Sequence, residues 1–422
     1  MFRLLSYFLA RLIRVGTLEV TDAGGGRHRY GNGARPSAHI RFNTGAAERA
    51  VALNPSLKLG ECFMDGEIDI LDGTIYDVLE VVAINSTDPG WGTVWMKAIE
   101  TARLLWRRAA QHNDLARSRR NVRHHYDLSA DFYSLFLDPD RQYSCAYFEH
   151  PEMGLDEAQL AKKRHVAAKL VMDRPNLSVL DIGCGWGGLG LYLAAHADAR
   201  VTGVTLSTEQ QAIAVQRAAA AGLSRCADFK LLDYRRAEGP FDRIVSVGMF
   251  EHVGKDFYDE FFGQAARLLD RDGVMLLHTI GHYQPPRNTN SFIAKYIFPG
   301  GYLPTLSEMT PAIERADLIV TDVEILRLHY ADTLRHWRQR FLARRDEAKA
   351  IYDERFCRMW EFYLAGSEAS FRFWDLNVFQ FQIARRHGAV PITRDYIAEA
   401  ERQLRLREAG LDLRGTACQA AE

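Results

Sequence analysis

The residues with the clearest chemical potential form a glycine-rich motif, VLDIGCGWGG, at residues 179–188. An apolar run ends around Asp181, and Gly183, Gly185 and Gly187 then lead into a helical pattern. Glycines at a strand-to-helix turn allow a tight bend and let a ligand approach the backbone closely. The motif therefore predicts a cofactor site at the carboxyl end of a strand.

The next strand limits the kind of cofactor that this turn can bind. Enzymes that use NAD place an acidic residue after that strand to bind the ribose, whereas here the strand ends as GVTLS (203–207) and Gln210 follows. NADP stays open, because Thr205 and Ser207 could hydrogen-bond a phosphate, although no arginine lies at that turn. The pattern disfavours a dinucleotide.

Two carboxylates suit S-adenosylmethionine instead. Asp181 precedes the glycines, where it could interact favourably with a sulfonium and its aminoacyl ammonium. Asp233 follows the third strand, beside Tyr234, where an adenine amino group could be read. We therefore predict a methyltransferase rather than a dinucleotide enzyme.

A sheet must position these residues, and short apolar runs separated by helical patterns predict it. Strands are expected at 178–182, 201–205, 228–232, 241–247, 273–280 and 318–326, and helices at 187–197, 208–221 and 256–270. This alternation indicates βαβ units. The predicted fold is α/β, a doubly wound, mostly parallel, seven-stranded Rossmann-like sheet with helical cover. Residues 281–310 are expected to cover one end of the sheet, and helical spacing continues from about 330 to 404.

A smaller α+β domain is expected before this sheet. Residues 1–16 predict a basic amphipathic helix that either docks on its own protein or contacts an anionic membrane surface. Residues 54–70 predict short strands around a turn at Asp65 and Gly66. Seven arginines between residues 103 and 123 predict either a solvated linker helix or a surface that faces phosphate groups.

Composition excludes several classes of function. The 422 residues carry a formal net charge of −1, which gives no basic field for nucleic acid. The six cysteines form no CxxC pair, and no third ligand is spaced to join His124 and His125, so we predict no metal site. No apolar run approaches the roughly 20 residues that cross a bilayer, and no signal peptide is indicated. A cytoplasmic protein is expected.

Six motifs, in consistent order over roughly residues 115–390, resemble the cyclopropane fatty acid synthases, a family that includes the mycolic acid cyclopropane synthases. These motifs are HHYDLSADFYSLFLD (124–138), YSCAYFE (143–149), LDIGCGWGG (180–188), GVTLS (203–207), MFEHVG (249–254) and LLHTIG (276–281). Weaker similarity extends through the N-terminal region, as in bacterial phospholipid enzymes that carry an extra lipid-binding domain.

The resemblance implies two sets of site residues. Contacts to S-adenosylmethionine would come from Tyr143, Ser144, Gly183, Thr205, Gln210, Asp233 and Tyr234, and we add Asp181, Gly185 and Gly187 from the glycine motif. A bicarbonate ion would be held by backbone groups of Cys145 and Ile280, the side chains of Glu251 and His278, and the Tyr330 hydroxyl. Structural roles stay open for three of these residues: Glu251 beside a helix start, His278 as a core histidine and Tyr330 as a packed tyrosine.

The chemistry explains why such residues are needed. An alkene is a poor nucleophile, so the sulfonium methyl must be held against it in a dry site. Methyl transfer leaves a carbocation on the acyl chain, which aromatic faces can stabilise without attacking it. Candidate rings are Tyr126, Phe132, Tyr133, Phe148, Tyr296 and Phe298. A base must then remove a proton before the ring closes, and bicarbonate could serve, although Glu251 beside it would need to be protonated or bridged by His252 or His278.

One position departs from the family pattern. Where the family has a cysteine, this chain has Ser367, in FYLAGSEASFR (362–372). Serine without a nearby base is a far weaker nucleophile than a thiolate. Since methylation of an alkene needs no enzyme nucleophile, we expect activity to survive, with the product in question.

We therefore expect an enzyme that transfers a methylene group from S-adenosylmethionine to the cis double bond of unsaturated phospholipid acyl chains, forming cyclopropane fatty acids. The alternatives are methylation without ring closure, a methyltransferase for small-molecule N or O atoms, and a non-enzymatic lipid-binding protein. Domains are expected at 1–110 (lipid-engaging), 111–405 (methyltransferase) and 406–422 (tail). The expected partner is phospholipid at the inner face of the cell membrane, contacted peripherally, and a homodimer is one expected state.

Overall fold

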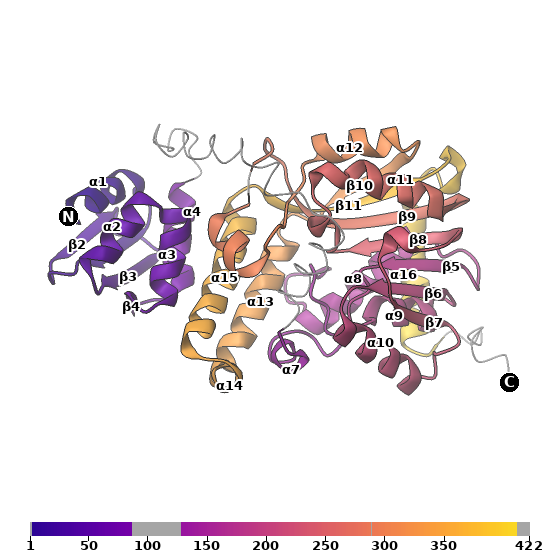
Figure 1. Cartoon of the computed structure of the whole chain (residues 1–422), viewed down its shortest axis with the longest axis horizontal. Helices are drawn as coiled ribbons and strands as arrows, with labels where there is room; N and C mark the ends of the chain where they lie inside the picture. Colours follow the sequence, from indigo (N-terminus) through magenta and orange to yellow (C-terminus); the bar gives the residue numbers. More distant parts are fainter. Residues whose placement is uncertain (1, 87–127, 288, 412–422) are drawn as a thin grey trace.

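A computed structural model describes residues 2–86, 128–287 and 289–411 (Figure 1). The arginines at 103–123, together with Tyr126, His124 and His125, fall outside these residues, so the predictions made for them stay predictions.

The first described segment forms the small α+β domain that the sequence predicts. Its four-stranded sheet has the order β2-β1-β3-β4, with β1 and β3 parallel and the other neighbours antiparallel. The elements are α1 (Phe2–Leu12), β1 (Thr17–Thr21), β2 (Arg27–Gly31), β3 (Ser37–Phe42), α2 (Gly45–Leu53), α3 (Pro55–Met64), β4 (Ile68–Asp72) and α4 (Ile75–Asn85).

The prediction of strands throughout residues 54–70 is wrong for its first part, which is helix α3. Pro55 at the first helical position has its φ already set for a helix, and residues 55–64 contain no β-branched side chain. Asp65 caps the helix, and Gly66 follows with φ +76°. Only β4 remains of the predicted strands.

The amphipathic helix α1 does dock on its own domain. Phe2, Leu5 and Leu12 are buried in the core of the small domain, together with strand residues such as Val20 and Ile40. Leu4 and Tyr7 lie on the opposite side, about half exposed at 47% and 51%. The helix therefore satisfies one of the two predicted contacts and leaves its outer face for the other.

The larger sheet has seven strands in the order β10-β11-β9-β8-β5-β6-β7 (Figure 1). Neighbours from β9 to β7 are parallel, and β11 runs antiparallel to both β9 and β10. The strands are β5 (Ser178–Ile182), β6 (Arg200–Thr205), β7 (Ala227–Leu231), β8 (Phe241–Val247), β9 (Leu269–His282), β10 (Ile319–Ile325) and β11 (Leu376–Ala384). This confirms the doubly wound, mostly parallel fold.

The helices agree with the predicted positions around β5 to β9. They are α7 (Ala130–Tyr133), α8 (Leu155–Lys169), α9 (Gly188–His196), α10 (Thr208–Ala220), α11 (Tyr258–Leu268), α12 (Leu306–Arg315), α13 (His329–Ala343), α14 (Arg345–Ile351), α15 (Glu354–Phe373) and α16 (Asp395–Glu408). Short helical turns are η2 (Tyr234–Arg236), η3 (Phe250–His252), η4 (Lys255–Phe257), η5 (Ile293–Ile297, a π-helix) and η6 (His387–Ala389). The predicted boundary between residues 405 and 406 falls inside α16.

The prediction of helical spacing from about 330 to 404 is wrong at β11. Phe379, Phe381 and Ile383 alternate with Gln380 and Gln382, which is the period of a strand. All five side chains are buried because both faces of the sheet are covered at β11: the three apolar ones pack with residues of α11 and α12, and the two glutamines bond Lys169 of α8.

Helices α13 and α15 stand between the small domain and the sheet (Figure 1). Helix α15 packs on α13 and also on α3 and α4. Arg358 of α15 donates to the carbonyl oxygens of Phe63 and Ile68, at 2.5 and 2.6 Å. The segment expected to cover the sheet end contributes a similar contact, since Lys295 and Tyr296 of η5 both bond Glu61.

Candidate active site

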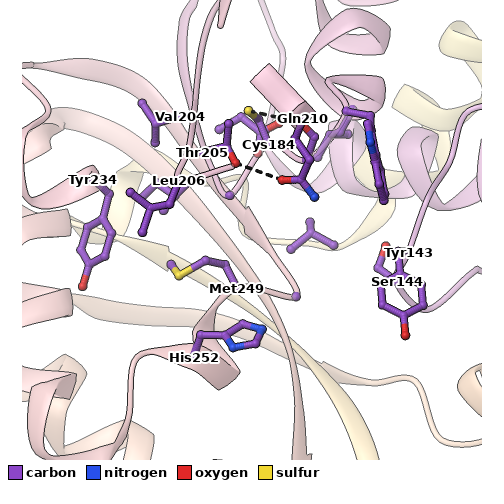
Figure 2. Close-up of a pocket in the computed structure, with 18 of the residues that line it drawn as sticks. Tyr143, Ser144, Cys184, Val204, Thr205, Leu206, Gln210, Tyr234, Met249 and His252 are labelled. Carbon is purple, nitrogen blue, oxygen red and sulfur yellow. Dashed lines mark hydrogen bonds between the residues drawn. The ribbon is translucent and has the colours of Figure 1, made fainter. Parts of the chain in front are cut away.

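A pocket opens at the carboxyl ends of β5, β6 and β8, where the strand order reverses on either side of β5. Ligands of open α/β sheets bind at this switch point. Nine of the ten predicted cofactor residues line the pocket: Tyr143, Ser144, Asp181, Gly183, Gly185, Thr205, Gln210, Asp233 and Tyr234. In Figure 2, Tyr143 and Ser144 lie across the pocket from Tyr234.

The glycine motif shapes the pocket wall through its backbone. Gly183 has φ +82°, and an added Cβ would come within 2.8 Å of the Met249 side chain. Gly185, at φ +55°, borders open space, so a ligand can reach its backbone. Gly187 is the one predicted cofactor residue outside the pocket lining: an added Cβ would meet Phe229 and Ala214, so it serves helix packing.

Asp181 presents an unpaired acceptor to the pocket. It is buried, and its Oδ2 atom has no hydrogen-bond partner among the described residues. Burial raises the pKa of this carboxyl to about 7, although the nearby Lys162 ammonium favours its charged form. A ligand that donates a positively charged N–H group here would supply the missing partner.

Lys162 is a pocket neighbour that sequence reasoning missed. Its side chain, fully buried in α8, donates to Ser144 Oγ at 2.9 Å and to Gln142 Oε1 at 2.5 Å. Burial lowers the pKa of Lys162 to about 8. The helical pattern of residues 155–169 does not distinguish this lysine from the charged residues next to it. Only the tertiary contacts reveal its role.

The other end of the pocket carries the acid predicted to read an adenine. Asp233 is buried, but both of its oxygens accept hydrogen bonds from the Arg235 guanidinium, at 2.9 and 2.8 Å. Oδ1 also accepts from the backbone N–H of Arg235, at 3.0 Å, which occupies its second acceptor site. Thr205 Oγ1 donates to Gln210 Oε1 at 3.0 Å (Figure 2), which leaves the amide NH₂ of Gln210 as a donor.

Beside the pocket, three residues predicted to bind bicarbonate are brought together at the ends of β8 and β9. The Ile280 amide donates to Glu251 Oε1 at 2.7 Å, while Glu251 Oε2 is buried with no partner in the described chain. Burial raises the pKa of Glu251 to about 7. His278 lies two residues before Ile280 on β9, and burial lowers the pKa of His278 to about 3, so it is neutral.

Cys145 and Tyr330, the other two, lie in an apolar cluster against which Ile280 packs. Burial raises the pKa of the Cys145 thiol well above its usual range, so it is no thiolate nucleophile. The Tyr330 ring contacts Trp337 and Phe371, with centroids 5.8 and 4.7 Å apart.

This apolar cluster adjoins the pocket directly. Tyr143 and Trp186 line the pocket and also pack in the cluster, and the Tyr143 and Tyr363 hydroxyls lie 2.9 Å apart. The Trp186 Nε1–H is buried without a hydrogen-bond partner in the described chain. Ser367 lies on α15 between Tyr363 and Phe371, four residues from each, on the helix face that meets the cluster.

The predicted aromatic candidates divide into three groups. Phe132, Tyr133 and Phe298 lie in or against the cluster, with the Phe298 ring 6.0 Å from those of Tyr363 and His252. Phe148 stacks on His329 and His336 at the edge of the cluster. Tyr296 also packs on it but uses its hydroxyl on Glu61.

Two further observations concern metal ions and membranes. Among the described residues, no three or more His, Cys, Asp or Glu side chains are grouped to hold a metal ion. Within the same residues, no helix combines the length and the apolar character that crossing a membrane requires.

Comparison with known proteins agrees with this geometry. The family model of mycolic acid cyclopropane synthetase matches residues 113–381, and a domain of unknown function matches residues 5–88. The cyclopropane-fatty-acyl-phospholipid synthase of Escherichia coli is 38% identical over 356 residues, which is 84% of this chain and 89% of that protein. The tuberculostearic acid methyltransferase of Mycobacterium tuberculosis is 37% identical over 355 residues, 81% of each chain.

Among solved structures, a mycolic acid cyclopropane synthase complexed with SAH and CTAB superposes with a TM-score of 0.60 at 39% identity. The match covers 63% of this chain and 97% of that one. The chain belongs to the mycolic acid cyclopropane synthetase family.

Proposed function

We propose that this protein transfers a methylene group from S-adenosylmethionine to the cis double bond of an unsaturated phospholipid acyl chain, forming a cyclopropane ring. One observation carries the proposal: a pocket with an unpaired buried carboxylate on Asp181 shares Tyr143 and Trp186 with an apolar cluster. A cationic donor and an apolar alkene can therefore meet across these two rings.

The residues present fit S-adenosylmethionine. When bound, it supplies an electrophilic methyl group. Its amino acid end is a zwitterion, which suits Asp181 Oδ2 for the ammonium and Ser144, backed by the Lys162 ammonium, for the carboxylate. Asp233 and Tyr234 would hold the adenine. Tyr234 lies at the end of the pocket away from Ser144 (Figure 2).

Aromatic side chains would stabilise the positive charge that develops on the acyl chain. Tyr143 packs on Trp337 with centroids 5.1 Å apart, and Tyr330 and Tyr363 lie close by in the same cluster. Ring faces attract a cation but do not form a bond to it. The surrounding apolar residues exclude water, which would otherwise trap the cation as an alcohol.

Glu251 and His278 would hold the anionic base, for which we propose bicarbonate. When bound, bicarbonate would accept the proton that the new methyl group must lose. Glu251, with its pKa raised to about 7, can be protonated through its unpaired Oε2 and donate to the anion. Because the Ile280 amide already bonds Glu251, Ile280 would act on the anion through that carboxyl. Cys145 and Tyr330 would complete the site.

The outer face of α1 would contact the membrane surface. Leu4 and Tyr7 are exposed there beside Arg3 and Arg11, and Arg14 follows. Apolar side chains next to arginines suit the boundary of an anionic lipid leaflet. Cytoplasmic location and a homodimer remain predictions.

A second candidate is methylation without ring closure. Ser367 occupies the cluster-facing position where the family has a cysteine, and the tuberculostearic acid methyltransferase is about as similar to this chain as the cyclopropane synthase. The two products share the first step and differ in which proton is lost afterwards.

Trideuteromethyl S-adenosylmethionine separates these outcomes. With vesicles of a cis-monounsaturated phospholipid, ring closure removes one deuteron, so the acyl chain gains a CD₂ group, and NMR shows no vinyl or methyl signal for the added carbon. A methyl-branched product keeps all three deuterons. Recovery of only the CD₃ product would overturn cyclopropanation, and absence of any acyl product would overturn both candidates.

A further inference from the structure

His278 is the last member of a buried series of polar side chains that are linked by hydrogen bonds. Gln380 lies directly opposite His278 in the register of β11 and β9, with its Nε2 atom 3.1 Å from His278 Nδ1. The other end of the same amide, Oε1, lies 2.8 Å from the Nζ atom of Lys169. His278, Gln380 and Lys169 are each at most 2% exposed.

Along this series of hydrogen bonds, the donor or acceptor role of each atom determines the role of its partner. A lysine ammonium has only N–H donors, so the Gln380 atom that faces Lys169 must be the carbonyl oxygen. The Gln380 amide nitrogen must then face His278 as a donor. A neutral imidazole can accept that bond at Nδ1 only if its proton is on Nε2.

Lys169 is itself held in place as a donor. Glu324 accepts from both Lys169 and His165, and His165 bonds Glu401 through its other ring nitrogen at 2.6 Å. This ion pair favours the ammonium form of Lys169 against the desolvation that burial imposes. The ion pair with Glu324 therefore determines which atoms donate and which accept along the series of hydrogen bonds.

We propose that Lys169 and Gln380 fix His278 as the Nε2–H tautomer, so that its other ring nitrogen, Nε2, is a hydrogen-bond donor toward the anionic base. Gln380 is then a positioning residue that acts through His278. The inference rests on the proposed function, because the bicarbonate of that proposal is the anion to which the His278 Nε2–H would donate. The opposite tautomer would present a lone pair to the anion and repel it.

The tautomer can be read without any turnover. In protein labelled with ¹⁵N-histidine, two-bond ¹H–¹⁵N correlation distinguishes a protonated ring nitrogen from an unprotonated one, and the His278→Asn variant identifies the His278 signals. We expect the wild-type protein to show Nδ1 unprotonated and Nε2 protonated, and Gln380→Met to show a mixture of tautomers. A wild-type His278 with its proton on Nδ1 would overturn the inference.

Gln382→Met is the matched control. Gln382 lies on the same strand and is equally buried, but its amide bonds the Lys169 carbonyl and the Tyr396 hydroxyl, not His278. We expect Gln380→Met to lower kcat about 10- to 100-fold, the effect of weakening the hydrogen bond that His278 would donate to the anionic base, with an unchanged KM for S-adenosylmethionine. Gln382→Met should leave the tautomer unchanged.

The two variants also distinguish this inference from the proposed function. Equal kcat in Gln380→Met and wild type, or an equal loss of kcat in both variants, would overturn the positioning role. A correct tautomer in a protein that alkylates no acyl chain would leave the hydrogen-bond chain intact and overturn the proposed function instead.

Discussion

Replacement of Lys162 by methionine tests the proposed binding of the amino acid end of S-adenosylmethionine. The Lys162 ammonium is fully buried, and its pKa falls from 10.5 to about 8. At 1.36 kcal/mol per unit, keeping it charged costs about 3 kcal/mol at neutral pH. Methionine removes that cost but leaves Ser144 and Gln142 without a donor, at about 1–3 kcal/mol for each.

These opposing effects nearly cancel in the free energy of unfolding. The affinity for S-adenosylmethionine, in contrast, responds only to the loss of the Lys162 charge. We expect the free energy of unfolding to change by less than about 2 kcal/mol. The dissociation constant for S-adenosylmethionine should rise about 10- to 100-fold, because the Lys162 charge that backs the Ser144 contact to its carboxylate is lost. Isothermal titration calorimetry gives the affinity and urea unfolding gives the stability.

The pH dependence has a definite sign. Because the pKa of Lys162 is lower in the folded than in the unfolded protein, its destabilising effect is full below about pH 8 and disappears as the pH rises toward 10.5. A bound carboxylate favours the ammonium, so affinity should weaken as the pH rises through about 8, with proton uptake on binding. The Lys162→Met variant should show a weaker pH dependence, because only the titration of the ligand's own ammonium group then remains in this range.

Lys163→Met is the matched control, since the neighbouring lysine bonds Asp140 at 2.6 Å, whereas Lys162 bonds Ser144. The reasoning is refuted if Lys162→Met binds S-adenosylmethionine within twofold of wild type. An equal loss of affinity in Lys163→Met would likewise show that the charge of the helix, and not Lys162 itself, sets the affinity.

Three further predictions follow from the site and the surface. Glu251→Ala should lower kcat at least about 100-fold, because the base loses a buried donor. The affinity for S-adenosylmethionine, measured by calorimetry, should not change. A parallel loss of affinity would contradict the assignment of Glu251 to the base rather than to the cofactor. Ser367→Cys should leave total acyl methylation within about threefold by mass spectrometry, since no enzyme nucleophile is needed, and a large gain would show that the thiol takes part. The double variant Leu4→Asp and Tyr7→Asp should weaken sedimentation with anionic vesicles about tenfold or more, with activity on a dispersed short-chain substrate retained; unchanged sedimentation would remove α1 from the membrane contact.

The sequence was informative wherever a feature is local. The turn at Gly183 and Gly185 needs positive φ angles, which glycine alone adopts readily, and the strands that follow are short apolar runs between helical patterns. These local signals, together with the family resemblance of the motifs, placed nine of the ten cofactor residues around one pocket.

The features that were missed depend on contacts distant in the sequence. Lys162 meets Ser144 through burial of α8, and Gln380 meets His278 across 102 residues through strand pairing. Strand β11 follows a 20-residue helix, and its alternation became decisive only with β9 and β10 on its two sides. Helix α3 was mistaken because Asp65 and Gly66 suit a helix end as well as a hairpin turn.

The most direct test of the central claim follows a labelled methyl group from S-adenosylmethionine into vesicles of two phospholipids with one head group and either cis-monounsaturated or saturated chains. If the donor pocket opens onto an apolar site for a double bond, label enters only the unsaturated chains and none is found in the head group. Equal labelling of saturated vesicles, or label confined to the head group, would contradict the account.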